Sequence, residues 1–120
     1  DAARALIDKA TILRCINGLE KAEAVSTVVD TKDTIVETKG DIIVRIPDRH
    51  LMFLEQTPQG FNYHSLLNAH KNIKMTVTDD IRLVKEMGIE CKVVEGSEQN
   101  FKITTQQDFK LAEILLKGNR

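Results

Sequence analysis

Residues 33–61 read DTIVETKGDIIVRIPDRHLMFLEQTPQGF, and the rest of the chain is organised around this stretch. β-Branched residues lie on both sides of the Lys39-Gly40 pair, a pattern that predicts a β-hairpin. If Thr38 pairs with Asp41, one face carries Thr34 opposite Arg45, and the other carries Ile35, Glu37, Ile42, Val44 and Ile46. A two-stranded ribbon is only marginally stable in water, so this apolar face needs cover from the chain's own core or from a second subunit.

The composition is that of one globular domain. The chain has 120 residues, of which 42% are hydrophobic and 29% are charged. A net charge of -1 leaves no basic excess for nucleic acid or for an anionic membrane. No apolar run approaches the roughly 18 to 20 residues of a membrane span, and no signal peptide is recognisable. Cys15 and Cys91 share no metal-site spacing, so we expect two reduced structural thiols. Together these features predict a cytoplasmic α/β protein.

Caps and apolar spacing predict four helices. Asp8 caps the first, the second runs from Asn62 to residue 73, and the third starts at an N-cap at Thr78 and ends at Gly88. A capping box at residues 105–108 opens the last. The side chains expected on the inner faces, taken helix by helix, are Ile12, Leu13, Ile16 and Leu19; Leu66, Leu67, Ala69 and His70; Ile81, Val84 and Met87; and Phe109, Ala112, Ile114, Leu115 and Leu116.

Short apolar runs between these helices predict strands. We expect a strand at 24–29 that is buried on both faces, an extended piece at 51–54, and strands at 93–94 and 101–104. Pro58 and Gly60 predict an ordered loop at 57–60, in which Gly60 supplies a positive φ. The alternation of helices and strands predicts an open, Rossmann-like and mostly parallel α/β sheet, with the hairpin at about residues 33–48 as a protruding arm.

Taken one at a time, the polar residues indicate no function. Asp1 and Arg4 could form a surface ion pair, and Asp1 could equally well be the carboxylate ligand of a metal ion. Arg49 beside Asp48 is typical of a solvated pair, and Lys102 is typical of a lysine that points out of a strand. His50, His64 and His70 have no Cys or acidic partner at metal-site spacing. Asp79 and Asp80 are typical of acidic residues that complement a helix dipole.

Seven segments carry a functional signal through their order. They are Asp1-Ala2-Ala3-Arg4, Asp33-Thr34, Asp48-Arg49, Thr57-Pro58-Gln59-Gly60-Phe61, Thr78-Asp79-Asp80, Val94-Glu95-Gly96 and Asn100-Phe101-Lys102-Ile103-Thr104-Thr105. In this order they resemble the C-terminal half of the 2-C-methyl-D-erythritol 4-phosphate cytidylyltransferases, over essentially the whole chain. The resemblance implies that residues 1–120 are the C-terminal part of a single cytidylyltransferase domain.

This resemblance implies a reaction and a set of roles. The family transfers CMP from CTP to the phosphate of methylerythritol phosphate and releases pyrophosphate, with Mg²⁺, in nonmevalonate isoprenoid synthesis. The acceptor phosphate attacks the α-phosphorus, so catalysis is positioning and charge neutralisation. By motif, Asp1 is the metal-side catalytic carboxylate and Lys102 the catalytic cation, while Ala2 and Thr57 contact substrate.

The same resemblance implies a homodimer. Thr34 and Arg49 match positions on an arm that reaches into the neighbouring subunit's site, where Arg49 would bind the methylerythritol phosphate. The chain departs from the family pattern at Ala5, Gln99 and Phe101. It also begins at Asp1 rather than Met, and the family's glycine-rich loop and cytosine pocket lie in an N-terminal half. We therefore expect that this half is missing from the sequence, and that the 120 residues alone are inactive.

Two alternatives stay open. The ribitol-5-phosphate cytidylyltransferases share the fold and the reaction class. Ala3 and Gly60 favour the methylerythritol enzymes, whereas residues 29–36 look slightly more like the ribitol enzymes. The other alternative is a noncatalytic dimerisation fragment that keeps the arm and has lost turnover.

Overall fold

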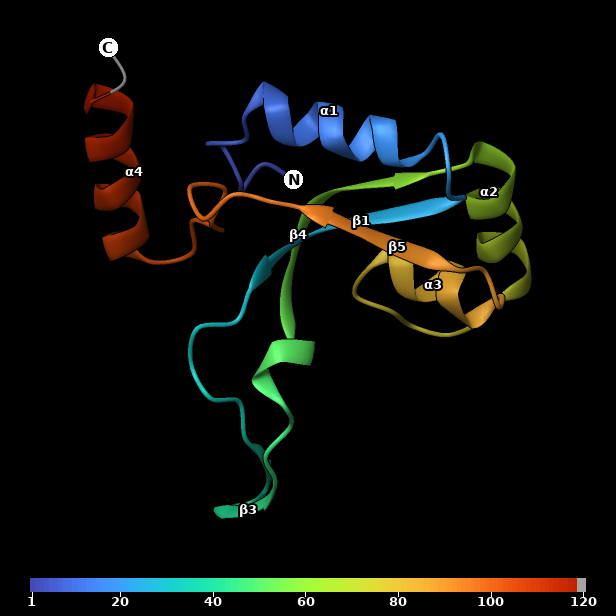
Figure 1. Cartoon of the computed structure of the whole chain (residues 1–120), viewed down its shortest axis with the longest axis horizontal. Coiled ribbons are helices and arrows are strands. Elements are labelled where there is room, and N and C mark those ends of the chain that lie inside the picture. Colours follow the sequence, from blue (N-terminus) through green and yellow to red (C-terminus); the bar gives the residue numbers. More distant parts are fainter. Residues whose placement is uncertain (119–120) are drawn as a thin grey trace.

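The computed structural model describes residues 1–118 and shows a three-stranded sheet with helices on both faces and a hairpin that leaves it (Figure 1). In chain order the elements are α1 Lys9–Gly18, β1 Ala24–Asp30, β2 Glu37–Lys39, β3 Ile42–Arg45, the 3-10 turn η1 Arg49–Leu51, β4 Phe53–Phe61, α2 Tyr63–Asn72, α3 Asp80–Glu86, β5 Cys91–Glu95 and α4 Gln106–Gly118. The sheet order is β4-β1-β5. Because β1 is antiparallel to β4 and parallel to β5, the α/β class is confirmed but the described sheet is mixed rather than mostly parallel.

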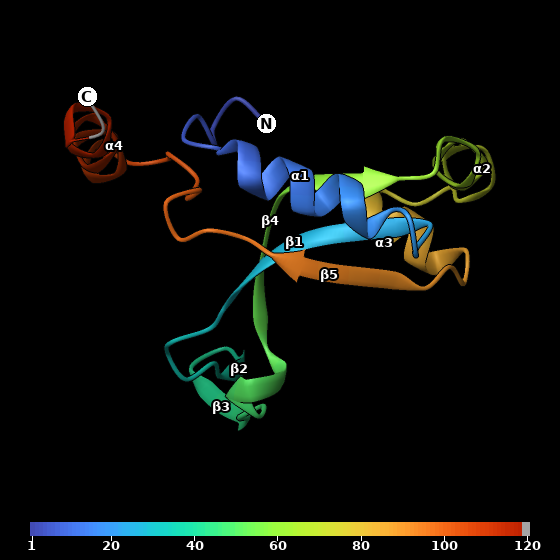
Figure 2. The ribbon, with the colours of Figure 1, turned by 45° about the horizontal axis from the view of Figure 1, so that its top comes forward.

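β1 is the central strand of the sheet and lies between two helical layers (Figure 2). Its successive side chains point to opposite faces and so meet different helices. Ala24 joins a core cluster with three residues of α2 and α3, namely Ala69, Leu83 and Val84. Val25 faces α1 instead, and a Cβ added to Gly18 of that helix would lie 3.1 Å from the Val25 Cγ2 atom. Burial on both faces is thus confirmed at the start of this strand.

The ladder between β1 and β4 is interrupted by a bulge. Ser26 pairs with Gln59, but the next residue, Thr27, pairs with Gln56, so two residues of β4 have no partner opposite them. They are Thr57 and Pro58, which are joined by a cis peptide bond. The prediction of a loop at 57–60 is therefore wrong. These residues belong to β4, and the bulge accommodates the proline within the strand.

Gly60 is required for close packing rather than for a positive φ. The glycines with positive φ in the described chain are Gly40 and Gly88, so the prediction for Gly60 is wrong. A Cβ at Gly60 would lie 2.9 Å from the Leu19 Cδ1 atom and 3.0 Å from the Cys15 Sγ atom. The missing side chain lets α1 approach β4.

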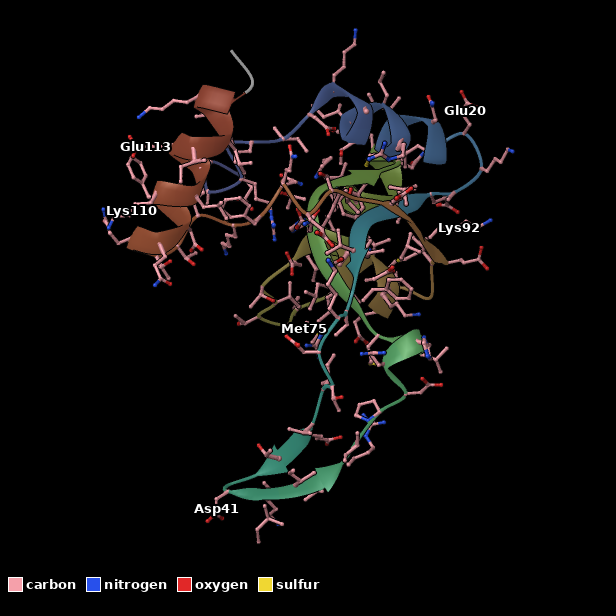
Figure 3. All side chains as sticks on the ribbon, turned by 60° about the vertical axis from the view of Figure 1, so that its left-hand side comes forward. Glu20, Asp41, Met75, Lys92, Lys110 and Glu113 are labelled. Atoms are coloured by element: carbon pink, nitrogen blue, oxygen red, sulfur yellow. The ribbon has the colours of Figure 1, made fainter. Side chains whose placement is uncertain are left out.

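β2 and β3 form the predicted hairpin, and Figure 3 shows Asp41 at its tip, far from the sheet. Lys39 pairs with Ile42, so the turn is Gly40-Asp41, one residue later than expected. Gly40 has φ 64, as type II′ turns require at the first central position. After a register shift, Glu37 rather than Thr34 lies opposite Arg45. The apolar side chains of the arm, exposed by 41% to 66%, are Val36, Ile42, Ile43, Val44 and Ile46.

α1 turns a different face inward from the one predicted. Asp8 caps it as expected, accepting a hydrogen bond of 2.6 Å from the Thr11 amide. The buried residues are Thr11 and Cys15, because small side chains let the helix pack closely on the sheet. The predicted inner residues that are 40% to 55% exposed instead are Ile12, Leu13 and Ile16.

α2 and α3 follow the prediction with local corrections. The N-cap of α3 is Asp79 rather than Thr78, and Gly88, with φ 78, ends the helix as predicted. Met87 is 37% exposed, while Leu83 takes the buried place that the apolar spacing did not assign to it. On α2, Ala69 is buried, but His70 is exposed and pairs with Asp80 at 2.8 Å.

The C-terminal region differs most from expectation. Residues 101–104 lie outside both described sheets, so the predicted strand is wrong. The capping box is confirmed: Asp108 Oδ2 accepts from the Thr105 amide at 2.8 Å, and Thr105 Oγ1 accepts from the Asp108 amide at 3.1 Å. α4 stands apart from the sheet (Figure 1), with Ala112 as its buried residue and with exposed apolar side chains at Phe109, Leu111, Ile114 and Leu116. Among residues 1–118, no helix has the length and apolar character needed to cross a membrane.

Candidate active site

The chain's first turn presents a carboxylate beside a guanidinium. Asp1 Oδ1 accepts a hydrogen bond of 3.1 Å from the Ala3 amide, and the Asp1 carbonyl accepts one of 3.1 Å from the Arg4 amide. These bonds fold residues 1–4 so that Arg4 Nε lies 3.5 Å from Asp1 Oδ2. The Asp1 side chain keeps 26% of its surface exposed. It is therefore held in place and still accessible to a ligand.

Arg4 connects this turn to two other segments. Its Nη1 atom donates to the Asn100 carbonyl at 2.7 Å, and its Nη2 atom donates to the Glu55 carbonyl at 3.4 Å. Burial lowers the pKa of Arg4, and the charge of Asp79 opposes that shift. An arginine remains a cation even so, because the ordinary pKa of a guanidinium lies far above neutrality. Arg4 is thus a fixed positive charge that ties the N-terminal turn to β4 and to the 96–104 segment.

The bulge in β4 directs Thr57 at the same carboxylate. Thr57 Oγ1 donates a hydrogen bond of 3.3 Å to Asp1 Oδ2. In a regular ladder, successive side chains alternate across the sheet; the two extra residues change that alternation locally. Thr57 and Asp1, which the sequence motifs nominate separately, are therefore neighbours.

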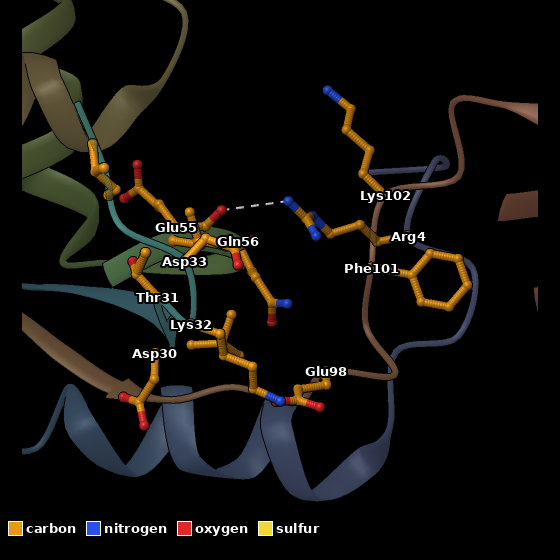
Figure 4. A pocket seen from close by; sticks show the side chains of 13 residues that line it. Arg4, Asp30, Thr31, Lys32, Asp33, Glu55, Gln56, Glu98, Phe101 and Lys102 are labelled. Carbon is orange, nitrogen blue, oxygen red and sulfur yellow. Dashed lines mark hydrogen bonds and ion pairs between the residues drawn. The ribbon is translucent and has the colours of Figure 1, made fainter. Parts of the chain in front are cut away.

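Lys102 lies on the segment beyond β5, which runs beside the N-terminal turn. The Ile103 amide donates to the Ala3 carbonyl at 2.8 Å, which lays residues 101–104 beside residues 1–4. Arg4 and Lys102 lie along one side of a cavity of about 640 Å³, with Asp30, Thr31 and Asp33 on the opposite side (Figure 4). The other charged residues that line this cavity are Lys32, Glu55 and Glu98. The side chain of Lys102 is exposed and free to meet an anion there.

The arm residues lie outside this group. Arg49 Nη1 donates to the Lys32 carbonyl at 2.7 Å, and both residues line a second cavity of about 390 Å³. Lys32 in turn forms an ion pair with Glu98, which raises the pKa of the Lys32 ammonium. Thr34 is exposed on the segment that leads to the hairpin. Within one chain, Asp1 and Thr57 are thus in contact, and a backbone bond between Ile103 and Ala3 joins the segments that carry Ala2 and Lys102. Arg49 and Thr34 lie outside this group.

Two buried residues of the site are not indicated by the sequence. Asn100 is 1% exposed and Gln56 is 6% exposed, and they contact each other beneath Thr57. Asn100 occurs in the Asn-Phe-Lys motif, but nothing in the apolar spacing separates it from a surface asparagine. Gln56 directly precedes Thr57 and reads as an ordinary polar residue of an edge strand.

A divalent cation at this site would need oxygen atoms from a ligand. No three or more His, Cys, Asp or Glu side chains within residues 1–118 cluster as a metal site. Mg²⁺ is commonly held by one or two carboxylates together with substrate phosphates and waters. Asp1, with a partly exposed carboxylate, fits the role of such a single protein ligand.

Comparison with known proteins places this geometry in a family. A family model described as IspD, 2-C-methyl-D-erythritol 4-phosphate cytidylyltransferase, matches residues 1–118. The enzyme of that name from Synechococcus elongatus is 39% identical over 121 residues, which covers 98% of this chain and 52% of the relative. The one from Trichormus variabilis is 38% identical, with 98% and 54% covered. The chain spans about half the length of the curated relatives it matches.

Solved structures share the fold. The crystal structure of 4-diphosphocytidyl-2C-methyl-D-erythritol synthase from Anaerococcus prevotii matches with a TM-score of 0.89 at 32% identity, over 98% of this chain and 56% of that one. The 2-C-methyl-D-erythritol 4-phosphate cytidylyltransferase of Thermus thermophilus matches with a TM-score of 0.87 at 32% identity, over 98% and 59%. Sequence and fold therefore agree along nearly all of its length, and the chain belongs to the IspD family of 2-C-methyl-D-erythritol 4-phosphate cytidylyltransferases.

Proposed function

We propose that the natural gene product of this chain transfers CMP from CTP to 2-C-methyl-D-erythritol 4-phosphate and releases pyrophosphate. The observation that carries the proposal is the convergence of three segments on Arg4. Asp1 Oδ2, which accepts a hydrogen bond from Thr57, lies 3.5 Å from Arg4 Nε, and Lys102 lines a cavity together with Arg4. Transfer between two anions requires positioning and positive charge more than it requires a protein nucleophile. Arg4 and Lys102 supply positive charge along one side of the cavity, opposite Asp30 and Asp33. Hydrogen bonds fix the position of Arg4 and of Thr57.

The residues divide the work by charge. Lys102 and Arg4 lower the repulsion between the acceptor phosphate and the nucleotide. The side chain of Lys102 is exposed, so it can approach the phosphate oxygens on which negative charge develops in the transition state. Asp1 would hold Mg²⁺, which when bound neutralises phosphate oxygens. Thr57, whose hydroxyl donates to Asp1, would orient substrate from the bulge. Ala2, which is exposed and follows Asp1 directly, would contact substrate beside it.

We also propose a homodimer in which the arm completes the neighbour's site. The exposed apolar side chains of the arm need cover, and a second subunit supplies it. Arg49 and Thr34 lie away from Asp1 within one chain, which fits a role across the interface, with Arg49 as a planar partner for the acceptor phosphate. The proposed compartment is the cytoplasm, where the free thiols of Cys15 and Cys91 would stay reduced.

The acceptor alcohol is tested by direct competition. The natural gene product is incubated with CTP, Mg²⁺ and either methylerythritol 4-phosphate or ribitol 5-phosphate, and pyrophosphate release is followed. The proposal predicts a kcat/KM for methylerythritol phosphate at least about tenfold higher, because a site built to hydrogen-bond its substrate rejects a poorly matching one. Preference for ribitol phosphate would support the sister family's reaction, and release with neither acceptor would contradict cytidylyl transfer.

A further inference from the structure

We propose that Asn100 and Gln56 form a buried clamp that positions Thr57 and Lys102 relative to each other. Gln56 lines the cavity of about 640 Å³ and Asn100 does not, but in this proposal both act through the residues they hold. The inference rests on the proposed function, because it assigns these two residues a task in the same site.

The bulge in β4 creates the need for the clamp. A bulge leaves its extra residues unpaired in the ladder, and buried carbonyl groups without a donor are costly. Two side chains satisfy them here. Asn100 Nδ2 donates to the Thr57 carbonyl at 2.7 Å, and Thr27 Oγ1 donates to the Pro58 carbonyl at 2.6 Å. Asn100 therefore fixes the backbone of the residue whose hydroxyl contacts Asp1.

Gln56 ties the same strand to the segment beyond β5. Gln56 Nε2 donates to the Ser97 carbonyl at 3.0 Å, and Gln56 Oε1 lies 3.4 Å from Asn100 Nδ2. A Cβ on Gly96 would come within 2.6 Å of Gln56 Oε1, so the segment leaves β5 directly against this side chain. The two amides thus hold the 96–100 turn on β4 from within the protein, where water does not compete for their hydrogen bonds.

The clamp also sets the place of Lys102, two residues further on. The Asn100 carbonyl accepts from Arg4, and the Ile103 amide donates to Ala3, so residues 100–103 are fixed on both sides of Lys102. Lys102 itself is exposed. Its position is therefore set by its neighbours rather than by contacts of its own side chain, and loosening Asn100 should let it move.

Hydrogen exchange tests the clamp without reference to activity. In the natural gene product, Asn100→Ala should accelerate exchange of the Ile103 amide by about tenfold or more, since it removes two buried hydrogen bonds that hold this segment. Exchange of the Met87 amide, bonded to Leu83 in α3, should not change. Gln99→Ala, which alters an exposed side chain next to the clamp, is the matched control and should change neither rate. An unchanged Ile103 rate in Asn100→Ala would overturn the proposal.

A second variant covers the case in which Asn100→Ala loosens the whole protein. Gln56→Met keeps the length of the side chain and removes its hydrogen bonds to Ser97 and Asn100. If both Ile103 and Met87 exchange faster in Asn100→Ala, Gln56→Met decides. Selective acceleration at Ile103 supports the clamp, and any other pattern in that variant overturns it.

A double-mutant cycle then tests whether the clamp acts through Lys102. Asn100→Ala should lower kcat by about tenfold or more, since small misplacements of a catalytic group are costly. In a Lys102→Ala background the same change should cost less than about twofold, because residues that act through one another are not additive. Equal losses in both backgrounds would overturn the positioning role. If the unaltered protein transfers no CMP, the proposed function fails, while the exchange rates still decide whether the clamp exists.

Discussion

The hydroxyl of Thr57 donates a hydrogen bond to the Asp1 carboxylate across 3.3 Å, although 56 positions separate the two residues. Two structural features bring them together. The bulge in β4 places Thr57 outside the regular alternation of the strand, and Arg4 anchors the N-terminal turn to β4 through the Glu55 carbonyl. The site is therefore built where the N-terminal turn, the bulge and the 96–104 segment meet.

Replacing Arg4 should destabilise the protein as well as disturb the site. Arg4→Leu leaves the carbonyl groups of Asn100 and Glu55 without their donor, and hydrogen bonds to a charged group contribute about 1.5–3 kcal/mol each. The bond to the Glu55 carbonyl is long, at 3.4 Å, and should add little. We therefore expect the free energy of unfolding, measured with urea, to fall by about 1.5–3 kcal/mol. Arg82→Leu, at an exposed position of α3, is the control. An equal loss in the two variants would contradict the anchoring role.

A methyl group at position 60 should separate α1 from β4. Gly60→Ala places a Cβ 2.9 Å from Leu19 and 3.0 Å from Cys15, and overpacking of this kind costs about 1–3 kcal/mol. Gly118→Ala is the matched control, since a Cβ there meets no atom within 4 Å. Unfolding of the first variant at a clearly lower urea concentration is the expected result, and coincident unfolding curves would show that α1 can shift without cost.

Local rules predicted the helices of this fold well. Asp8, Gly88 and the Thr105–Asp108 box mark helix ends in the structure as they do in the sequence, because caps act between residues close in the chain. Short motifs nominate Asp1 and Lys102 in the same way. The bond between the Ile103 amide and the Ala3 carbonyl lays their segments side by side, although the strand expected around Lys102 is absent. Their catalytic roles stay predictions.

What the sequence could not predict depends on contacts between distant residues. The bulge at Thr57 and Pro58 looks like a loop until β1 is placed opposite it. The buried face of α1 is chosen by its fit to Gly60, not by apolar spacing. Asn100 and Gln56 look like surface residues because amide side chains reveal burial only through the partners they meet.

Acidification should loosen the start of α4. Hydrogen bonds from the Thr104 amide and from the hydroxyl and amide of Thr105 lower the pKa of Asp108 below its ordinary value of 3.8. A carboxyl group with a lowered folded-state pKa stabilises the fold fully above its ordinary pKa, and that contribution is lost as the pH falls through the lowered value. We therefore expect exchange of the Thr105 amide to show extra acceleration below about pH 4.

Asp108→Asn provides the control for this titration, because its side chain carries no titrating proton. The pH-dependent excess should be absent in that variant, after correction for the intrinsic exchange rate. The same excess in both proteins would show that another group controls the start of α4.

Subunit mixing tests the role of the arm. Arg49→Ala and Asp1→Asn variants of the natural gene product should each be nearly inactive. Heterodimers formed by joint refolding contain one intact site, so an equal mixture should regain about a quarter of the normal activity by random assortment. If the mixture stays as inactive as its components, Arg49 acts within its own subunit or not at all.

The central claim is that Lys102 acts in cytidylyl transfer at the Asp1 site, and ³¹P NMR of the reaction tests it most directly. The natural gene product is mixed with CTP, methylerythritol 4-phosphate and Mg²⁺, alongside Lys102→Ala and the α4 control Lys110→Ala. We predict diphosphate-diester and pyrophosphate resonances for the unaltered protein and the control. Lys102→Ala should form them about a hundredfold more slowly or worse, with an unchanged Tm, because its exposed side chain adds little stability. Absence of both products with the unaltered protein, or an undiminished rate in Lys102→Ala, would contradict the account.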